Sequence, residues 1–124
     1  MNFRLKTSSY VADRLKQLQS ATNLTPNILA RIAVSLSLKQ NSIPTPPSSE
    51  AGGLEFNRNT LTGEHDYLFR ALIAQHANRE VSDDEFFPEL FNAHLERGVR
   101  LLSSEYQHAG NYDKFIINLI RQAK

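Results

Sequence analysis

Basic side chains are concentrated at the start of the chain, where they could bind phosphate groups. The first 39 residues hold six basic residues and one acid, a net charge of +5, whereas the rest of the chain holds eight basic and twelve acidic residues, a net charge of −4. Arginine and lysine donate charge-assisted hydrogen bonds to phosphate. Nucleic acid is the commonest anionic partner of such a segment. We therefore expect the N-terminal segment to contact double-stranded DNA.

The pattern of residues 2–39 predicts one strand followed by two helices. Residues 2–7 alternate between apolar and polar side chains, so a strand there has one apolar face and one basic face. A hydroxyl side chain at Thr7 or Ser8 is expected to cap a first helix that reaches about residue 21. Thr25 is the expected N-cap of the second helix, with Pro26 in its first turn.

A strand and two helices with a basic strand face are typical of ribbon–helix–helix proteins. In these proteins two chains pair their strands into a ribbon that enters the major groove. The expected DNA-binding residues lie on the outward strand face, on the helices and at the open N–H groups that start the second helix. They are Arg4, Lys6, Arg14, Lys16, Thr25, Asn27 and Arg31. The alternative is an edge strand whose charges only discourage aggregation.

The remainder of the chain predicts a linker and further helices. Residues 40–53 hold three of the five prolines and two adjacent glycines, which is typical of a linker or a surface loop. Residues 54–124 are expected to form a brief extended segment and about three helices, packed in the same domain as residues 1–39. The predicted fold class is mainly α, with a short N-terminal strand, about five helices and a ribbon–helix–helix-like N-terminal half. One helix is expected to bury Tyr67, Leu68, Ala71, Leu72 and Ile73.

No group of side chains predicts catalysis or a metal site. The chain has no cysteine, which excludes thiolate metal ligands and a cysteine nucleophile. The four histidines share no ligand spacing, and the acids at 83–85 suit the first turn of a helix. Asn57 and Arg58 are expected to order a loop, or to pair with Glu64. We therefore predict a protein that is not an enzyme and needs no metal or cofactor.

The composition is that of a small cytoplasmic globular chain. It has 124 residues, of which 40% are hydrophobic and 22% are charged. A chain of this size buries a limited fraction of its surface, so oligomerisation is a reasonable way to gain stability. No apolar run reaches the length of a membrane-spanning helix. We expect a cytoplasmic protein without membrane contact.

Three stretches carry a more specific pattern: RLKTSSYVADRLKQLQSATNLTPNILARIAVSLSL at 4–38, GLEFNRNTLTGEHDYLF at 53–69 and HLERGVRLL at 94–102. In order and spacing they resemble the DndE family of bacterial DNA sulfur-modification (phosphorothioation) proteins. The central stretch is the most specific of the three, because no generic helix requires it. The sequence departs from the family at Asn59 and His65, where aromatic residues are expected.

The resemblance implies a DNA-binding subunit of the phosphorothioation system that acts beside partner proteins supplying sulfur and ATP-driven DNA handling. It also implies a homotetramer that prefers nicked duplex DNA. Two other functions stay open. One is a protein–protein adaptor, in which the apolar second helix builds the oligomer and the acidic C-terminal half docks partner enzymes. The other is a free-standing ribbon–helix–helix repressor that binds one operator tightly.

Overall fold

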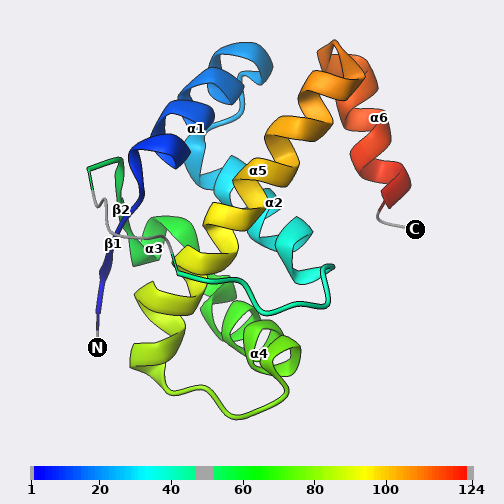
Figure 1. Cartoon of the computed structure of the whole chain (residues 1–124). Helices are drawn as coiled ribbons and strands as arrows, with labels where there is room; N and C mark the ends of the chain where they lie inside the picture. The colour runs from blue at the N-terminus through cyan, green and yellow to red at the C-terminus, as the bar shows by residue number, and fades with distance from the viewer. Residues whose placement is uncertain (1, 47–51, 123–124) are drawn as a thin grey trace.

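The computed structural model describes residues 2–46 and 52–122, and it is mainly helical (Figure 1). The strands are β1 (Arg4–Lys6) and β2 (Glu55–Asn57). The helical elements are α1 (Ser9–Thr22), α2 (Pro26–Leu38), α3 (Arg58–Leu61), η1 (Gly63–His65), α4 (Asp66–Ala77), η2 (Glu85–Leu90), α5 (Phe91–Ala109) and α6 (Tyr112–Gln122). The predicted mainly α class is confirmed, with six α-helices in the described residues instead of about five. None of these described helices is long and apolar enough to cross a membrane.

α1 and α2 form where the sequence predicts them, because local signals set their boundaries. The Ser8 hydroxyl accepts a hydrogen bond from the backbone N–H of Val11 at 3.2 Å and so caps α1. α1 ends at Thr22, and its C-cap Asn23 adopts the left-handed conformation that asparagine tolerates. Pro26 opens α2, since a first-turn residue needs no N–H donor.

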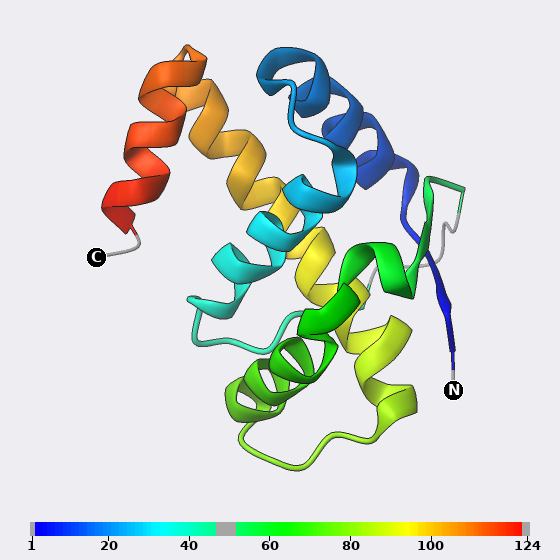
Figure 2. The same cartoon turned by 180° about the vertical axis from the view of Figure 1, so that it is seen from behind.

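α2 and α5 cross at the centre of the molecule, with α1 and α6 toward one end and α4 toward the other (Figures 1 and 2). Gly98 makes this crossing close, because a Cβ at Gly98 would overlap the backbone carbonyl of Ala33 in α2. A single hydrophobic cluster of described residues draws on both strands and all six α-helices. The two halves of the chain therefore share one core.

β1 pairs with β2 of the same chain, in an antiparallel register that places Leu5 opposite Phe56. The outer edge of β1 is also engaged. The carbonyl of Asn2 accepts a hydrogen bond from Arg58 Nη1 at 3.1 Å, and the carbonyl of Lys6 accepts one from Asn92 Nδ2 at 3.3 Å. The ribbon–helix–helix arrangement predicted for the N-terminal half is therefore not confirmed. The extended segment after the linker supplies the partner strand within the chain.

α4 turns a different face to the core than its sequence predicts. Phe69 and Ile73 are buried, whereas Tyr67 is 86% exposed, Leu68 is 55% exposed and Leu72 is 36% exposed. The predicted buried face was wrong at Tyr67, Leu68, Ala71 and Leu72, and right at Ile73. Apolar residues surround most of this helix, so periodicity alone allowed two stripes. Packing of the Phe69 ring against the Phe91 ring, at 5.7 Å between centroids, selects one of them.

Candidate nucleic-acid interface

The strand β1 presents Arg4 and Lys6 to solvent. Arg4 Nη1 lies 3.4 Å from Glu55 Oε2 of the neighbouring strand, and both side chains are more than half exposed. An exposed pair of this kind contributes little free energy and opens readily. Both basic residues therefore remain accessible to an anion, although Glu55 partly neutralises Arg4.

The two basic residues predicted on α1 lie on different flanks of the helix. Arg14 and Lys16 are two residues apart, which separates them by about 200° around a helix of 3.6 residues per turn. Arg14 Nη1 donates to Gln17 Oε1 at 3.2 Å, and its guanidinium lies over the Tyr10 ring. Lys16 instead lines a pocket that also includes Pro26 and Gly52. The structure thus brings Lys16, but not Arg14, to the start of α2.

The start of α2 offers fewer free hydrogen-bond donors for phosphate than the sequence predicts. Thr25 occupies the N-cap position and is exposed, but its side chain makes no capping hydrogen bond. Asn27 is half-buried. Arg31 donates from Nε to the carbonyl of Leu61 at 2.6 Å and from Nη2 to the carbonyl of Thr60 at 2.8 Å. Most of the donor capacity of Arg31 therefore holds α3 against α2.

A stripe on α5 contacts the junction of β1 and α1. Asn92, Glu96 and Arg100 recur every four residues, so they share one face of α5. In order, they contact the Lys6 carbonyl, the Ser8 hydroxyl and the Tyr10 ring. We call these six residues the β1–α1–α5 seam. Sequence reasoning missed Arg100, because it lies in the acidic half of the chain and no local pattern links it to Tyr10.

Arg58 is the most completely bound basic residue among those described. It is 3% exposed, and each of its three nitrogen atoms donates a hydrogen bond. The acceptors are Asp66, Asp83 and the carbonyl of Asn2. The hydrogen bonds to Asp66 and then Asp83 raise the pKa of Arg58 above its ordinary value. The hydrogen bond from Arg58 lowers the pKa of each aspartate in turn.

The contacts of Arg58 correct one sequence-based prediction and support another. Arg58 pairs with Asp66 and Asp83 rather than with Glu64, so that predicted partner was wrong. The loop-ordering role of Asn57 is confirmed, because Asn57 Oδ1 accepts a hydrogen bond from the N–H of Asn59 at 2.9 Å. The whole arrangement joins α3 to Asn2 ahead of β1, to α4 and to the segment before η2.

Two histidines that are far apart in the sequence, and share no metal-ligand spacing, lie in contact between α4 and α5. The rings of His76 and His94 lie 4.8 Å apart, edge to face. His94 Nδ1 is 2.8 Å from Ser37 Oγ, which also accepts a hydrogen bond from Arg97 Nε. Burial, then the neighbouring His76 and Arg97, lower the pKa of His94 to about 4. His94 is therefore neutral near pH 7, and its contacts serve packing.

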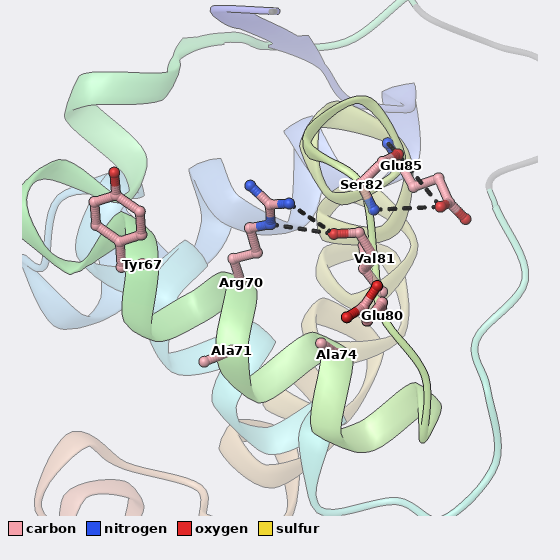
Figure 3. Close-up of a pocket in the computed structure, with 8 residues that line it drawn as sticks. All are labelled: Tyr67, Arg70, Ala71, Ala74, Glu80, Val81, Ser82 and Glu85. Carbon is pink, nitrogen blue, oxygen red and sulfur yellow. Dashed lines mark hydrogen bonds between the residues drawn. The ribbon is translucent and has the colours of Figure 1, made fainter.

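A groove lies between α4 and the segment that leads into η2 (Figure 3). Arg70 donates from Nε and Nη2 to the carbonyl of Val81, at 3.2 and 2.9 Å. Ser82 and Glu85 bond each other's backbone and side chain, in the capping-box arrangement that their spacing predicts. Arg70, Ser82 and Glu85 are thus engaged in holding the wall of the groove together.

A comparison with protein families gives one match that spans most of the chain. The model described as DNA sulphur modification protein DndE matches residues 4–122. The chain belongs to the DndE family. The family resemblance predicted from three short stretches is thereby confirmed. No curated protein matches the chain in sequence.

Two solved DndE structures resemble the chain in three dimensions. The crystal structure of DndE from Escherichia coli B7A, described as involved in DNA phosphorothioation modification, has a TM-score of 0.65 and 25% identity. The similarity covers 80% of this chain and 96% of that one. A DndE mutant in which two glycines are replaced by lysine gives a TM-score of 0.64 and 24% identity, over 82% and 97% of the two chains.

The central stretch of the DndE resemblance, residues 53–69, supplies part of the buried cluster described above. It contains both Arg58 and Asp66, which hydrogen-bond at 2.8 and 2.9 Å. The two positions that depart from the expected family pattern, Asn59 and His65, are both exposed. Their substitution therefore leaves the buried part of this DndE segment intact.

Proposed function

We propose that this chain is a DNA-binding subunit of the bacterial DNA phosphorothioation system. The family match over residues 4–122 is the observation that carries this proposal. The similarity to a DndE described as involved in DNA phosphorothioation supports it. In this proposal the protein is cytoplasmic, performs no catalytic step, uses no cofactor and acts beside the other proteins of the modification machinery.

The proposed contact is with backbone phosphates of duplex DNA. The accessible basic residues Arg4, Lys6, Arg14 and Lys16 support this mode, because phosphate contacts position a protein without reading sequence. Thr25, Asn27 and Arg31 stay in the proposed set as lesser contributors, since the Arg31 guanidinium is already bound to two carbonyls. A preference for nicked duplex and a homotetrameric assembly complete the proposal, and both come from the family resemblance.

The test is fluorescence anisotropy with intact and nicked duplexes of one sequence, titrated across a salt series. We expect the logarithm of affinity to fall linearly with the logarithm of salt concentration, with a slope that corresponds to several phosphates. We also expect tighter binding to the nicked duplex. Absence of binding at low salt would contradict the proposed function.

An adaptor within the same machinery is the second candidate. The outward face of α4, with Tyr67, Leu68 and Leu72, supports it because exposed apolar patches mark interaction surfaces. Binding to a partner protein that persists without DNA, from a chain that has no DNA affinity, would favour the adaptor. The repressor alternative has less support, since β1 already pairs with β2 and would need a free edge to form a ribbon between chains.

A further inference from the structure

We propose that Arg14 and Arg100, held on the ring of Tyr10, bind phosphate groups of the DNA backbone. This inference rests on the proposed function and adds a residue, Arg100, from the acidic half of the chain. The Arg100 guanidinium carbon lies 4.2 Å from the centroid of the Tyr10 ring, and that of Arg14 lies 5.2 Å from the same centroid. Two segments far apart in the sequence therefore place their cations over the same aromatic ring.

The two positive charges are close to each other and lack a paired carboxylate. Their separation cannot exceed the sum of their distances to the Tyr10 centroid, which is below the ~10 Å Debye length at 0.1 M salt. Within the described residues, neither arginine forms a salt bridge, whereas Arg4, Arg58, Arg70 and Arg79 do. Phosphate groups bound at Arg14 and Arg100 would offset their mutual repulsion.

The carboxylate nearest along the seam is that of Glu96. Both of its oxygen atoms lie within hydrogen-bonding distance of the Ser8 hydroxyl, at 3.0 and 3.3 Å. Glu96 therefore joins α5 to the start of α1 and, among the described residues, forms no ion pair with Arg14 or Arg100. The seam holds two cations, Lys6 and Arg100, against the one carboxylate of Glu96, and Arg14 lies beside it on Tyr10, so the local charge is positive.

The two guanidinium groups keep most of their N–H donors free to bind phosphate. Arg14 uses one nitrogen, which donates to Gln17 at 3.2 Å. Among the residues that the structure describes, none accepts a hydrogen bond from Arg100. A guanidinium that stacks on an aromatic ring keeps the N–H donors at its edge, and this planar fork matches two phosphate oxygens. Tyr10 therefore orients the donors without consuming them.

The length of the seam fits a stretch of nucleic-acid backbone. Asn92 and Arg100 are eight residues apart on α5, a rise of about 12 Å at 1.5 Å per residue. Asn92 contacts the backbone of Lys6 at one end, and Arg100 contacts Tyr10 at the other. Successive phosphates of one strand advance ~3.4 Å along a duplex axis, so a seam aligned with that axis spans roughly three to four base-pair steps.

The test compares Arg100→Ala with Arg121→Ala in the anisotropy assay on duplex DNA. Arg121 is an exposed arginine on α6, at the opposite side of the molecule from β1, so both variants lose one positive charge (Figures 1 and 2). We expect Arg100→Ala to weaken binding by about tenfold, as for one lost charge-assisted contact. We also expect this variant to have a shallower dependence of log affinity on log salt concentration, by about one phosphate contact. Arg121→Ala should stay within about twofold of wild type, because a remote charge acts only through the screened field.

Two further variants separate a contact from a general charge effect. Arg14→Ala should weaken binding in the same direction, and its effect combined with Arg100→Ala should be less than the product of the two, because both bind the same stretch of backbone. Arg100→Lys keeps the charge but loses the planar fork, so its affinity should lie between those of Arg100→Ala and wild type. Thermal melting by circular dichroism confirms that each variant is folded.

The outcomes distinguish this inference from the proposed function. If wild type binds and Arg100→Ala behaves like Arg121→Ala, the assignment of the seam is overturned while the DNA-binding function stands. If wild-type protein does not bind either duplex at low salt, both fail together. Selective loss with Arg100→Ala and Arg14→Ala supports both.

Discussion

Arg58 and Arg100 both place a guanidinium over an aromatic ring, yet their surroundings are opposite. Arg58 is 3% exposed, lies 5.1–5.2 Å from the centroids of Phe86 and Phe87, and binds two carboxylates and a carbonyl. Arg100 is exposed, lies over Tyr10 and has no carboxylate partner among the described residues. The charge of Arg58 is compensated inside the molecule, whereas that of Arg100 is open to solvent.

The difference has a simple physical origin. A buried charge needs paired charges and hydrogen bonds. Removing it from water costs roughly several kcal/mol, and only close partners offset that cost. A surface charge remains hydrated and can exchange water for an external anion. A count of basic residues therefore overestimates the phosphate-binding surface. Arg31 lies between the two cases, since backbone carbonyls take up part of its guanidinium.

The largest expected effect is that of Arg58→Ala on stability. The change leaves Asp66 and Asp83 without their main partner, so we expect the free energy of unfolding to fall by about 3–5 kcal/mol. Urea denaturation followed by circular dichroism measures it. Arg100→Ala is the matched control. A loss below about 1 kcal/mol for Arg58→Ala would mean that the cluster does not anchor the fold.

Arg58→Lys should have a smaller effect of the same sign. Lysine keeps the positive charge but presents one ammonium group, so it cannot donate to both aspartates and to the Asn2 carbonyl in the same geometry. We expect a loss of about 1–3 kcal/mol, the cost of leaving buried polar groups unpaired. The same urea titration provides the measurement, and wild-type stability in this variant would argue against the fork geometry.

Acid should weaken the Arg58 cluster through its two aspartates. The pKa of Asp66 and that of Asp83 lie below the ordinary value of 3.8, chiefly because of the hydrogen bonds from Arg58. A carboxyl with a lowered folded-state pKa contributes stability above 3.8 and loses it as the pH falls through the folded-state pKa. We expect the free energy of unfolding to decrease below pH 3.8 in wild type and in Arg100→Ala. That part of the decrease should be absent from Arg58→Ala.

His94 acts in a separate and higher pH window. Its pKa is about 4 in the folded protein against an ordinary value of 6.5, so the unfolded chain binds a proton first as the pH falls. The stability from neutral His94 is therefore fully present above pH 6.5 and is lost between pH 6.5 and about 4. Urea titrations at pH 7, 5 and 3.5 separate this window from that of the aspartates. A flat profile between pH 7 and 5 would contradict the burial of His94.

The smallest expected effect on stability is that of Arg100→Ala. An exposed cation–π contact contributes about 0.5–1 kcal/mol, so the unfolding free energy should change by no more than that. The same variant should lose DNA affinity as described above. A stability loss comparable to that of Arg58→Ala would make Arg100 a structural residue and remove the contrast between the two sites.

Short-range patterns predicted much of the fold. The cap at Ser8, the proline start of α2 and the box formed by Ser82 and Glu85 follow from residues within a few positions of one another. The α4 face could not be predicted in this way, because its apolar residues surround the helix and only contact with Phe91 selects Phe69. The strand that pairs with β1 could not be predicted either. An alternating pattern specifies which face of a strand is buried, but it does not specify the neighbouring strand.

By itself, the sequence determined the helical class, the main helix boundaries, the family and the concentration of basic residues near the N-terminus. Each of these depends on residue type and near-neighbour spacing. Only the tertiary structure decided which cations remain available. It buried Arg58 between two aspartates, bound Arg31 to backbone carbonyls and brought Arg100 of α5 to Tyr10 of α1. The reason is that a charge is neutralised by whatever packs against it, and those neighbours come from distant parts of the chain.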